Sequence, residues 1–358
     1  MSSIENIDIV LDARYGDCGK GKVVYDLLTK RGHNLCVKAN GGSNAGNSIY
    51  YQHNNTYQKI VLHMLPIGVV KPNVYNLIAS DCVIDIEKLK TEIEYLKNLD
   101  IDITGRLFIS KACHIITPEA IAYDKANNLV GTTGTGIGPT YANKALRIGK
   151  RIECDDEETR KQIECLESLG VQIVDMRHFW NSPFVKTHIT SVIFQGSQGF
   201  ELDPNWCKTY PYCTSSCCTL ASAINTGIPI KKIRDIIVIA KAYDTYVGTM
   251  QFQPTNDETL EQIAILGKEV GSTTGRKRQC NYLNLDDLKI ALQVNNANIC
   301  IINKVDILNE VKVFKLYHQN ELVSFENLDA MKQFISNEIK NTLPDIILTI
   351  YSGSPYEI

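Results

Sequence analysis

The sequence predicts an α/β protein built on a large, mainly parallel central sheet that helices cover on both faces. Apolar, β-branched runs of strand length recur along most of the 358 residues, and helical patterns separate them. Strands with apolar residues on both faces are typical of parallel sheets that are covered on both sides. No Pro/Gly/Ser-rich linker and no internal repeat divides the chain, so we expect one domain over residues 1–358.

The expected elements follow one another along the chain. Apolar runs predict strands at 7–12, 59–65, 76–80, 191–196, 235–243, 298–304 and 345–351. Helical periodicity predicts helices at 21–31, 86–98, 118–127, 157–168, 217–226, 257–268, 285–295 and 327–341. Long polar loops rich in Gly, Thr and Ser are expected at 40–48, 131–149, 209–216 and 271–278. Such loops supply the N–H groups, hydroxyls and positive charge that phosphates and carboxylates require.

The composition argues against several classes of protein. The formal net charge is −3 with both signs mixed along the chain, so we expect no nucleic-acid partner. No apolar run reaches the roughly 18 residues that a membrane span needs, and the N-terminus lacks a secretory pattern. We therefore expect a cytoplasmic protein, in the host cytoplasm if a phage encodes it. The 12 cysteines are expected to be free thiols, because no ligand spacing indicates zinc.

Residues 14–22, RYGDCGKGK, form a glycine-rich turn between an apolar run and a helical pattern. Glycines let the backbone approach an anion, lysines supply charge, and the following helix presents N–H groups. These properties predict that the backbone at Gly16, Gly19 and Gly21 approaches a phosphate and that Lys20 or Lys22 supplies a positive charge to it. Val23 stands where the standard P-loop has a Mg²⁺-binding hydroxyl, so another ligand is needed. Asp17 is the nearest carboxylate.

The motif NKVD at 303–306 directly follows an apolar run. The carboxylate of Asp306 can accept the N1–H and N2–H groups of guanine, a pair that adenine cannot offer, and the stem of Lys304 can pack on the ring. Together with a phosphate loop, this motif predicts that the protein binds a guanine nucleotide.

The loop GSTTGRKR at 271–278 combines hydroxyls and guanidiniums. Arg276 and Arg278 lie two residues apart, so in extended backbone both face the same way. Convergent guanidiniums with hydroxyls fit a small dicarboxylate. The residues concerned are Thr273, Thr274, Arg276 and Arg278.

In this order along the chain, nine motifs resemble those of the adenylosuccinate synthetases: RYGDCGKGK, NGGSNAGNS, VLHMLPIG, GTTGTGIGPTYANKALRIG, GSQG, TYPYCTSS, KAYDTYVGT, GSTTGRKR and NKVD. The resemblance runs from about residue 7 to residue 308, with a weaker tail at 351–355. The chain looks like the compact form of the family, as in archaea and some phages. The resemblance implies a P-loop-NTPase-like adenylosuccinate synthetase fold and a homodimer.

The resemblance also implies a reaction. It is a GTP-dependent ligase reaction that joins L-aspartate to C6 of a 6-oxopurine nucleotide, normally IMP. In the family, the first-loop acid takes the N1–H of the base, and O6 then attacks the γ-phosphate of GTP. The amine of aspartate displaces phosphate from the resulting 6-phosphoryl intermediate. Asp17 matches the acid, and Asp17 with the carbonyl of Gly46 matches the Mg²⁺ ligands.

The remaining site residues follow by position. Catalytic positions match Asp17, Lys20, Asn47 and Gln198. Positions that contact the substrate nucleotide match Asn44, Thr133, Arg147, Gln198 and Thr214, with Arg147 reaching the partner subunit's site. L-Aspartate is expected on Thr273, Thr274, Arg276 and Arg278. GTP is expected on Gly16, Gly19, Lys20, Gly21, Lys22, Lys304, Asp306, Ser352 and Gly353.

The chain departs from the family in ways that keep alternatives open. Asn47 stands where the family usually has a catalytic histidine, and an amide cannot transfer a proton near neutral pH. Thr135 replaces a usual arginine, and Cys18 and Gln195 each replace a glutamate. The retained Asp17 favours IMP, because a guanine 2-amino group would crowd it. The alternatives are the same chemistry on GMP or dGMP, for phage 2-aminoadenine DNA, and a weakly catalytic protein that binds purine nucleotides.

Overall fold

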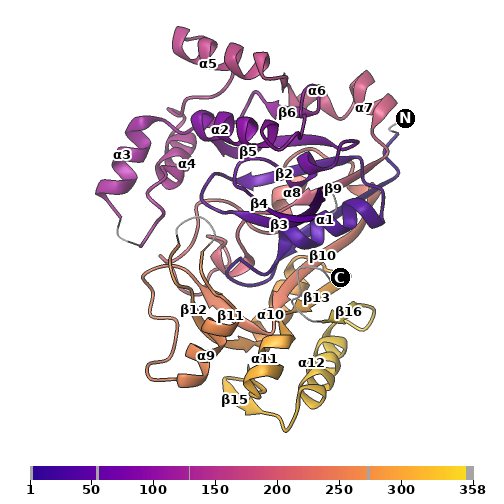
Figure 1. Ribbon diagram of the computed structural model, residues 1–358, viewed down its shortest axis with the longest axis vertical. Coiled ribbons are helices and arrows are strands. Elements are labelled where there is room, and N and C mark those ends of the chain that lie inside the picture. Colours follow the sequence, from indigo (N-terminus) through magenta and orange to yellow (C-terminus); the bar gives the residue numbers. More distant parts are fainter. Residues whose placement is uncertain (1–2, 54–55, 129, 272–274, 352–358) are drawn as a thin grey trace.

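A parallel sheet forms the centre of the molecule (Figure 1). The computed structural model describes residues 3–53, 56–128, 130–271 and 275–351. Within them, a ten-stranded sheet has the order β16 (Ile347–Ile350), β13 (Ile299–Asn303), β10 (Ile233–Lys241), β1 (Asn6–Asp12), β9 (Ser191–Gln195), β2 (Leu35–Gly41), β5 (Tyr75–Ile84), β6 (Leu107–Ser110) and β8 (Val171–Val174), and β7 (His114–Ile115) pairs with β5. Every pair in it is parallel, which confirms the predicted fold class.

The other described elements surround this sheet. A four-stranded sheet has the order β11 (Tyr243–Tyr246), β12 (Gln279–Asn284), β14 (Lys315–His318) and β15 (Glu321–Ser324), and a hairpin joins β3 (Asn47–His53) to β4 (Thr56–Leu62). The helices are α1 (Lys20–Lys30), α2 (Ile86–Lys97), α3 (Pro118–Ala126), α4 (Ile137–Leu146), α5 (Glu157–Ser168), α6 (Met176–Phe179), α7 (Pro183–His188), α8 (Ala221–Ile224), α9 (Glu258–Leu266), α10 (Leu285–Val294), α11 (Val305–Val311) and α12 (Leu328–Thr342). Short 3₁₀ turns lie at Ile67–Val70, Phe200–Leu202 and Ile230–Lys232.

The sheet is buried on both faces, as the apolar runs predict. Along β1, Ile9 and Leu11 belong to one core cluster, while Val10 between them belongs to the other. The first cluster takes in side chains of α9, α10 and α12, and the second takes in α1, α2 and the β3–β4 hairpin. Alternate side chains of a strand point to opposite faces, so each face needs its own helical cover. Figure 1 shows α2 and α5 at one end and α9, α11 and α12 at the other.

Two predicted elements are corrected by the structure. The strand expected at 59–65 is β4, which ends at Leu62 and pairs antiparallel with β3 instead of joining the large sheet. The strand does not continue beyond Leu62, because the Glu92 carboxylate accepts hydrogen bonds from the N–H groups of Met64 and Leu65, both at 3.0 Å. The helix expected at 217–226 is helical only in α8, because side chains bond the preceding N–H groups: Asp203 Oδ2 accepts from Cys218 at 2.6 Å and Asn295 Oδ1 accepts from Leu220 at 2.7 Å.

The prediction also missed some elements. Residues 131–149, expected as a loop, contain helix α4. The strand β2 in the large sheet, the strand β3 and the whole four-stranded sheet were not predicted. None of the described helices is long and apolar enough to cross a bilayer.

Candidate active site

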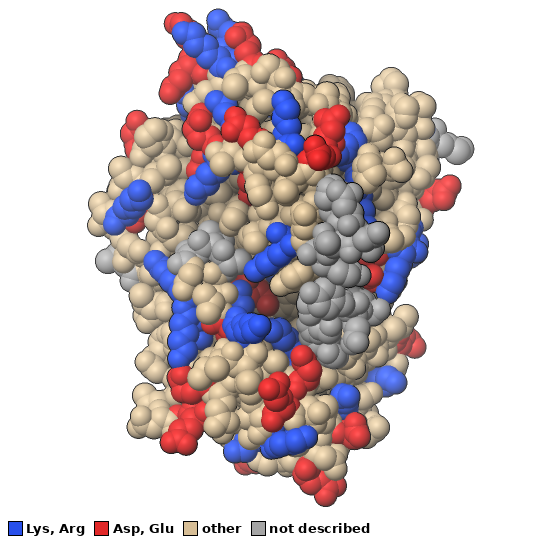
Figure 2. Space-filling model, in the orientation of Figure 1, with Lys and Arg blue, Asp and Glu red and all other residues tan. Residues whose placement is uncertain are grey.

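The carboxyl ends of neighbouring parallel strands lie at one edge of the sheet, and there the predicted motifs meet. The loops after β1, β2, β9 and β13 carry four of the motifs, and β13, β10, β1, β9 and β2 are consecutive in the sheet. In open α/β sheets, ligands bind at this edge. Figure 2 shows Lys and Arg side chains gathered across the middle of one face of the molecule.

The first loop, residues 14–22, is shaped by Asp12, a buried carboxylate that the sequence reasoning missed. Asp12 Oδ1 accepts the N–H groups of Arg14 at 3.0 Å and Gly16 at 3.2 Å. Its Oδ2 accepts from the N–H of Cys18 and from Lys20 Nζ, both at 3.0 Å. One carboxylate at the end of β1 therefore folds the loop around itself. The signal for it was an acid that ends an apolar run directly before a glycine-rich turn.

Lys20 is buried and bonded at the start of α1. Besides Asp12, its Nζ donates to the carbonyl of Gln198 at 2.7 Å. Burial alone would lower the pKa of Lys20, but the adjacent Asp12 outweighs burial and raises that pKa. Lys20 thus carries a permanent positive charge in the loop, as a phosphate-contacting lysine requires.

Two other loops pack against the first loop. A Cβ added to Gly199 would lie 2.1 Å from the carbonyl oxygen of Arg14, so the GSQG loop packs directly on the backbone of the first loop. Asn303 of the NKVD motif donates Nδ2–H to the carbonyl of Cys18 at 2.6 Å. Gly19 has φ +92°, a left-handed conformation that glycine adopts without strain. The motifs that follow β1, β9 and β13 thus form one unit.

The second loop, residues 40–48, leads into β3 and lies next to the first loop. A Cβ added to Gly21 would lie 3.2 Å from the Cβ of Asn47, so Asn47 lies over the first turn of α1. Gln198 Nε2 donates to Asn44 Oδ1 at 3.2 Å. The structure therefore brings Asn44, Asn47 and Gln198 to the first loop.

Asp17 meets the predicted aspartate loop. Its side chain is 37% exposed, and its Oδ2 lies 2.9 Å from Nε of Arg278. The other end of that guanidinium donates from Nη1 to Glu269 Oε2 at 2.7 Å. Arg276 instead bonds carbonyls of the 131–149 segment, Gly131 at 2.9 Å and Thr132 at 3.2 Å. The two arginines thus take different partners, while Thr273 and Thr274 lie outside the described residues.

The predicted guanine motif sits at the start of α11. Lys304 has φ +67°, and its Nζ donates to the carbonyl of Gly267 at 2.9 Å. Burial lowers the pKa of Lys304. Asp306 lies in the first turn of α11 and is half-buried. Lys22 Nζ lies 5.2 Å above the ring of Tyr351, while Ser352 and Gly353 lie outside the described residues.

The remaining nucleotide-contacting residues are less closely connected. Thr133 Oγ1 bonds Thr135 Oγ1 at 2.8 Å, and the N–H of Thr214 donates to the carbonyl of Leu202 at 2.8 Å. Arg147 ends α4 in a left-handed conformation and is exposed. Among the described residues, no hydrogen bond or ion pair joins the Arg147 side chain to the first loop.

Comparison with known proteins decides the family. A family model described as "Adenylosuccinate synthetase" matches residues 9–167 and 152–341. An adenylosuccinate synthetase of Aquifex aeolicus is 36% identical over 353 residues, with 86% of this chain and 79% of the relative covered. One of Komagataella phaffii is 34% identical over 372 residues, with 90% and 85% covered. The chain belongs to the adenylosuccinate synthetase family.

Solved structures agree with this assignment of the synthetase fold. A fully ligated adenylosuccinate synthetase from Plasmodium falciparum superimposes with a TM-score of 0.80 at 25% identity and covers 98% of each chain. A cyanophage S-2L succinoaminodeoxyadenylate synthetase, bound to dGMP and dATP, gives a TM-score of 0.75 at 20% identity, with 98% of this chain and 93% of that chain covered. The second likeness shows the fold alone. The synthetase family is one of ligases that form a C–N bond.

The donors at the predicted metal site of this chain suit Mg²⁺. Asp17 offers carboxylate oxygen and Gly46 offers a carbonyl oxygen, and both are hard ligands. Mg²⁺ typically takes one or two carboxylates and completes its shell with phosphate oxygens and water. The described residues contain no group of three or more His, Cys, Asp or Glu side chains that could hold a metal. The residues therefore fit a metal that binds together with a nucleotide.

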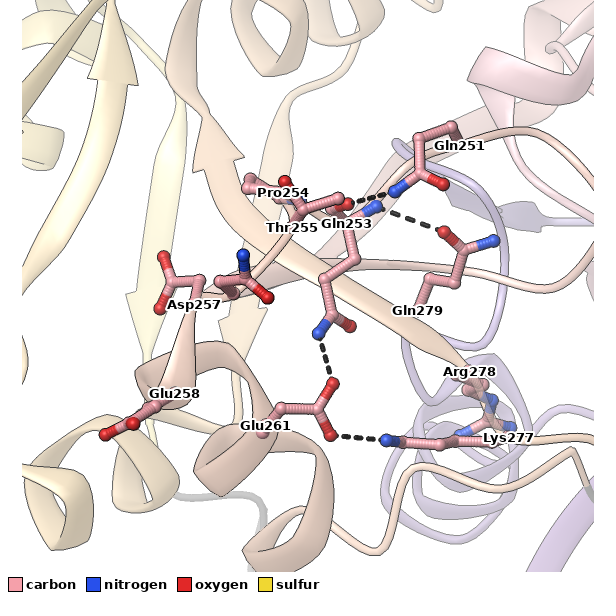
Figure 3. A pocket seen from close by; sticks show the side chains of 11 residues that line it. Gln251, Gln253, Pro254, Thr255, Asp257, Glu258, Glu261, Lys277, Arg278 and Gln279 are labelled. Carbon is pink, nitrogen blue, oxygen red and sulfur yellow. Dashed lines mark hydrogen bonds and ion pairs between the residues drawn. The ribbon is translucent and has the colours of Figure 1, made fainter.

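A cavity of about 470 Å³ opens beside Arg278 (Figure 3). Its lining is polar and internally bonded: Gln253 donates to Glu261 at 2.6 Å, and Glu261 pairs with Lys277. The lining residues are Gln251, Gln253, Pro254, Thr255, Asn256, Asp257, Glu258, Glu261, Lys277, Arg278 and Gln279. The cavity was not predicted from the sequence, because it forms only when residues 251–261 and 277–279 pack against each other in the fold.

The cysteine thiols of this chain are free, as expected. Cys18, in the first loop, is buried, and its Sγ donates to the carbonyl of Gly16 at 3.4 Å. Burial raises the pKa of Cys18 well above its usual range. A neutral thiol is a poor nucleophile, so Cys18 fills space in the loop.

Proposed function

We propose that the protein catalyses the GTP-dependent ligation of L-aspartate to C6 of IMP through a 6-phosphoryl intermediate. The observation that carries the proposal is the position of Asp17. Its carboxylate lies in the phosphate loop, one turn before Lys20, and touches Arg278 of the predicted aspartate loop. A base, a phosphate-binding lysine and an aspartate-binding arginine thereby converge, which is what this two-step reaction needs.

In the first step, Asp17 accepts the N1 proton of the base, and the electrons move to O6. O6 forms a bond to the γ-phosphorus of GTP, the bond to the β,γ-bridging oxygen breaks, and GDP leaves. Lys20 stabilises charge on the phosphate because it is permanently protonated. Removal of a proton by a positioned base commonly contributes about 10²–10⁴-fold to a rate.

In the second step, the amine of L-aspartate attacks C6, the C–N bond forms, and the C6–O bond breaks; the departing phosphate takes up the proton that the amine loses. The amino acid's carboxylates are held by the arginines and hydroxyls of the 271–278 loop: Thr273, Thr274, Arg276 and Arg278. Asp17 and the carbonyl of Gly46 would hold Mg²⁺, which would supply positive charge for the transfer of the phosphate.

The other site residues take the roles that the family implies. We assign contacts with IMP to Asn44, Thr133, Arg147, Gln198 and Thr214, and contacts with GTP to Gly16, Gly19, Lys20, Gly21, Lys22, Lys304, Asp306, Ser352 and Gly353. Asn47 faces the first turn of α1, where its amide can donate to a phosphate oxygen.

We also propose a homodimer in which Arg147 reaches the partner subunit's nucleotide. The residues on either side of Arg147 support this, because Leu146 is 67% exposed and Ile148 is 71% exposed. Adjacent exposed apolar side chains are typical of protein interfaces. A cytoplasmic location stays a prediction.

A second substrate remains an alternative, because Asn47 stands where the family usually has a histidine that donates a proton. The alternative is the same ligation on GMP or dGMP. Purified protein should be given GTP, Mg²⁺ and L-aspartate with IMP, dIMP, GMP or dGMP in parallel, and phosphate release should be measured. We expect release with IMP. Phosphate release with dGMP alone would overturn the proposal that IMP is the substrate. If the nucleotides bind but none of them leads to phosphate release, the protein would instead be a weakly catalytic nucleotide-binding protein.

A further inference from the structure

Glu269 is a buried carboxylate that the catalytic scheme leaves without a role. It lies in the turn after α9 and is 1% exposed. Its Oε1 accepts from Tyr243 Oη at 2.6 Å and Lys241 Nζ at 3.2 Å, and its Oε2 accepts from Arg278 Nη1 at 2.7 Å. Burial alone would raise the pKa of Glu269, but Lys241 and Arg278 lower it to about 2. The carboxylate is therefore ionised at neutral pH.

Arg278 is tied to Glu269 at two points. Besides the side-chain bond, the N–H of Arg278 donates to the carbonyl of Glu269 at 3.0 Å. Nη1 of its guanidinium donates to Glu269, whereas Nε lies 2.9 Å from Asp17 Oδ2 as an ion pair but makes no hydrogen bond. In the part of the chain that the structure describes, Nη2 makes no hydrogen bond. Glu269 thus fixes the direction in which the remaining donor edge points.

Glu269 also competes with Asp17 for the same guanidinium. The Asp17 side chain is 37% exposed, whereas the Glu269 side chain is 1% exposed. Ion pairs away from solvent are screened less, so Glu269 holds Arg278 more strongly. Without Glu269, Asp17 would be the nearest anion left to Arg278. A bidentate pair with Arg278 would then occupy the carboxylate that must accept the N1 proton.

The same turn contacts the guanine motif through its backbone. Lys304 Nζ donates to the carbonyl of Gly267. A Cβ on Gly267 would lie 2.5 Å from Tyr243 Oη and 3.2 Å from Glu269 Cγ, so Gly267, Tyr243 and Glu269 pack as one unit. Because the Lys304 bond goes to a backbone oxygen, it does not depend on the Glu269 carboxylate. The effects on aspartate and on GTP can therefore be separated.

We propose that Glu269 is a positioning residue of the ligase: it presents the open edge of Arg278 to a carboxylate of L-aspartate and keeps Arg278 from closing on Asp17. The inference rests on the proposed function, because it takes L-aspartate as the ligand of Arg278. Glu269 itself touches no substrate and acts only through Arg278.

The test compares Glu269→Gln with a matched control, Glu261→Gln. Glu261 is 47% exposed and pairs with Lys277, the residue next to Arg278, so the control removes a neighbouring ion pair of the same loop. For Glu269→Gln we expect the KM for L-aspartate to rise about 10- to 100-fold, because a charge-assisted bond is lost. The KM values for GTP and IMP should stay within about threefold. Glu261→Gln should leave all three unchanged.

Glu269→Gln leaves the buried Lys241 without its carboxylate partner, and this could prevent the variant from folding. A second variant is therefore needed. Tyr243→Phe removes one bond to Glu269 and no charge. We expect a rise of about threefold in the KM for L-aspartate, with an unchanged melting temperature. An L-aspartate KM within twofold of wild type in every folded variant would overturn the proposal. Wild-type protein that releases no phosphate with any of the four nucleotides would instead overturn the proposed function.

Discussion

Asp17 Oδ2 lies 2.9 Å from Arg278 Nε, so two residues 261 positions apart in the chain meet at one point. Asp17 holds φ +57°, a left-handed conformation that is uncommon outside glycine. The loop is kept in this form by Asp12, which bonds the N–H groups on either side of residue 17. These bonds fix the orientation of Asp17, the proposed base, which faces the loop that is proposed to bind aspartate.

Asp17→Asn should abolish turnover, because an amide cannot accept the N1 proton. We expect a fall in kcat of at least about 10²-fold, the usual contribution of a general base. Nucleotide binding, measured by calorimetry with IMP and GTP, should largely survive. Asp26→Asn, in α1 where the half-buried Asp26 pairs with Lys30, is the control and should keep full activity. Near-normal turnover in Asp17→Asn would remove Asp17 from the role of base.

Asn47→His should raise kcat, because it restores a proton donor over the first turn of α1. The gain should be present at low pH and disappear as the pH rises through about 6.5, where an imidazole loses its proton. A pH–rate profile of both proteins measures this. Asn47→Ala is the companion variant and should lower kcat, since it removes the amide donor. An Asn47→His variant with no gain at any pH would mean that hydrogen bonding by Asn47 is sufficient.

Gly199→Ala should destabilise the protein and impair phosphate binding. The added Cβ would lie 2.1 Å from the carbonyl oxygen of Arg14 and 2.5 Å from the nitrogen of Gly16, and both are backbone atoms. Overpacking of this kind costs about 1–3 kcal/mol, occasionally more. Urea unfolding and the KM for GTP measure the two effects. Gly138→Ala in α4, where the nearest atom would be 3.4 Å away, should be neutral, and equal midpoints for both variants would contradict the prediction.

The stability of the protein should fall as the pH rises from about 5 to 8, through Glu201. Burial raises the pKa of Glu201 to about 7. The nearby carboxylates of Asp287 and Asp244 also raise this pKa, whereas the ion pair with Arg14 lowers it. A carboxyl whose folded pKa is raised binds its proton more tightly in the folded state. Its stabilising contribution is complete below pH 4.5 and is lost through about pH 7.

Glu201→Gln removes this titration and still offers an oxygen to Arg14. We expect the melting temperature of the variant to vary less between pH 5 and 8 than that of wild type. Glu321→Gln, on the exposed strand β15, is the control and should keep the wild-type slope. Identical slopes in all three proteins would contradict the prediction.

Much of the site was predictable because its motifs are local. The glycines and lysines of residues 14–22 and the NKVD motif each carry their chemistry within a few positions, and the strands before them are read from apolar runs. Asp12 and Glu269 were missed, because their roles come from burial and from contacts that form only in the fold: Asp12 with Lys20, and Glu269 with Lys241 and Arg278. The expectation that Arg276 and Arg278 face the same way assumes regular extended backbone, and their contacts differ. The proposal of a single domain stays a prediction.

By itself, the sequence determined the parallel α/β architecture, the family, and most residues at the edge of the sheet. Hydrophobic periodicity and short motifs encode these features within segments of a few residues. Only the tertiary structure decided how the loops touch: Asn303 on Cys18, Gly199 on Arg14 and Arg278 between Asp17 and Glu269. The physical reason is that ion pairs and close backbone contacts depend on distances in space, which the order of residues along the chain does not specify.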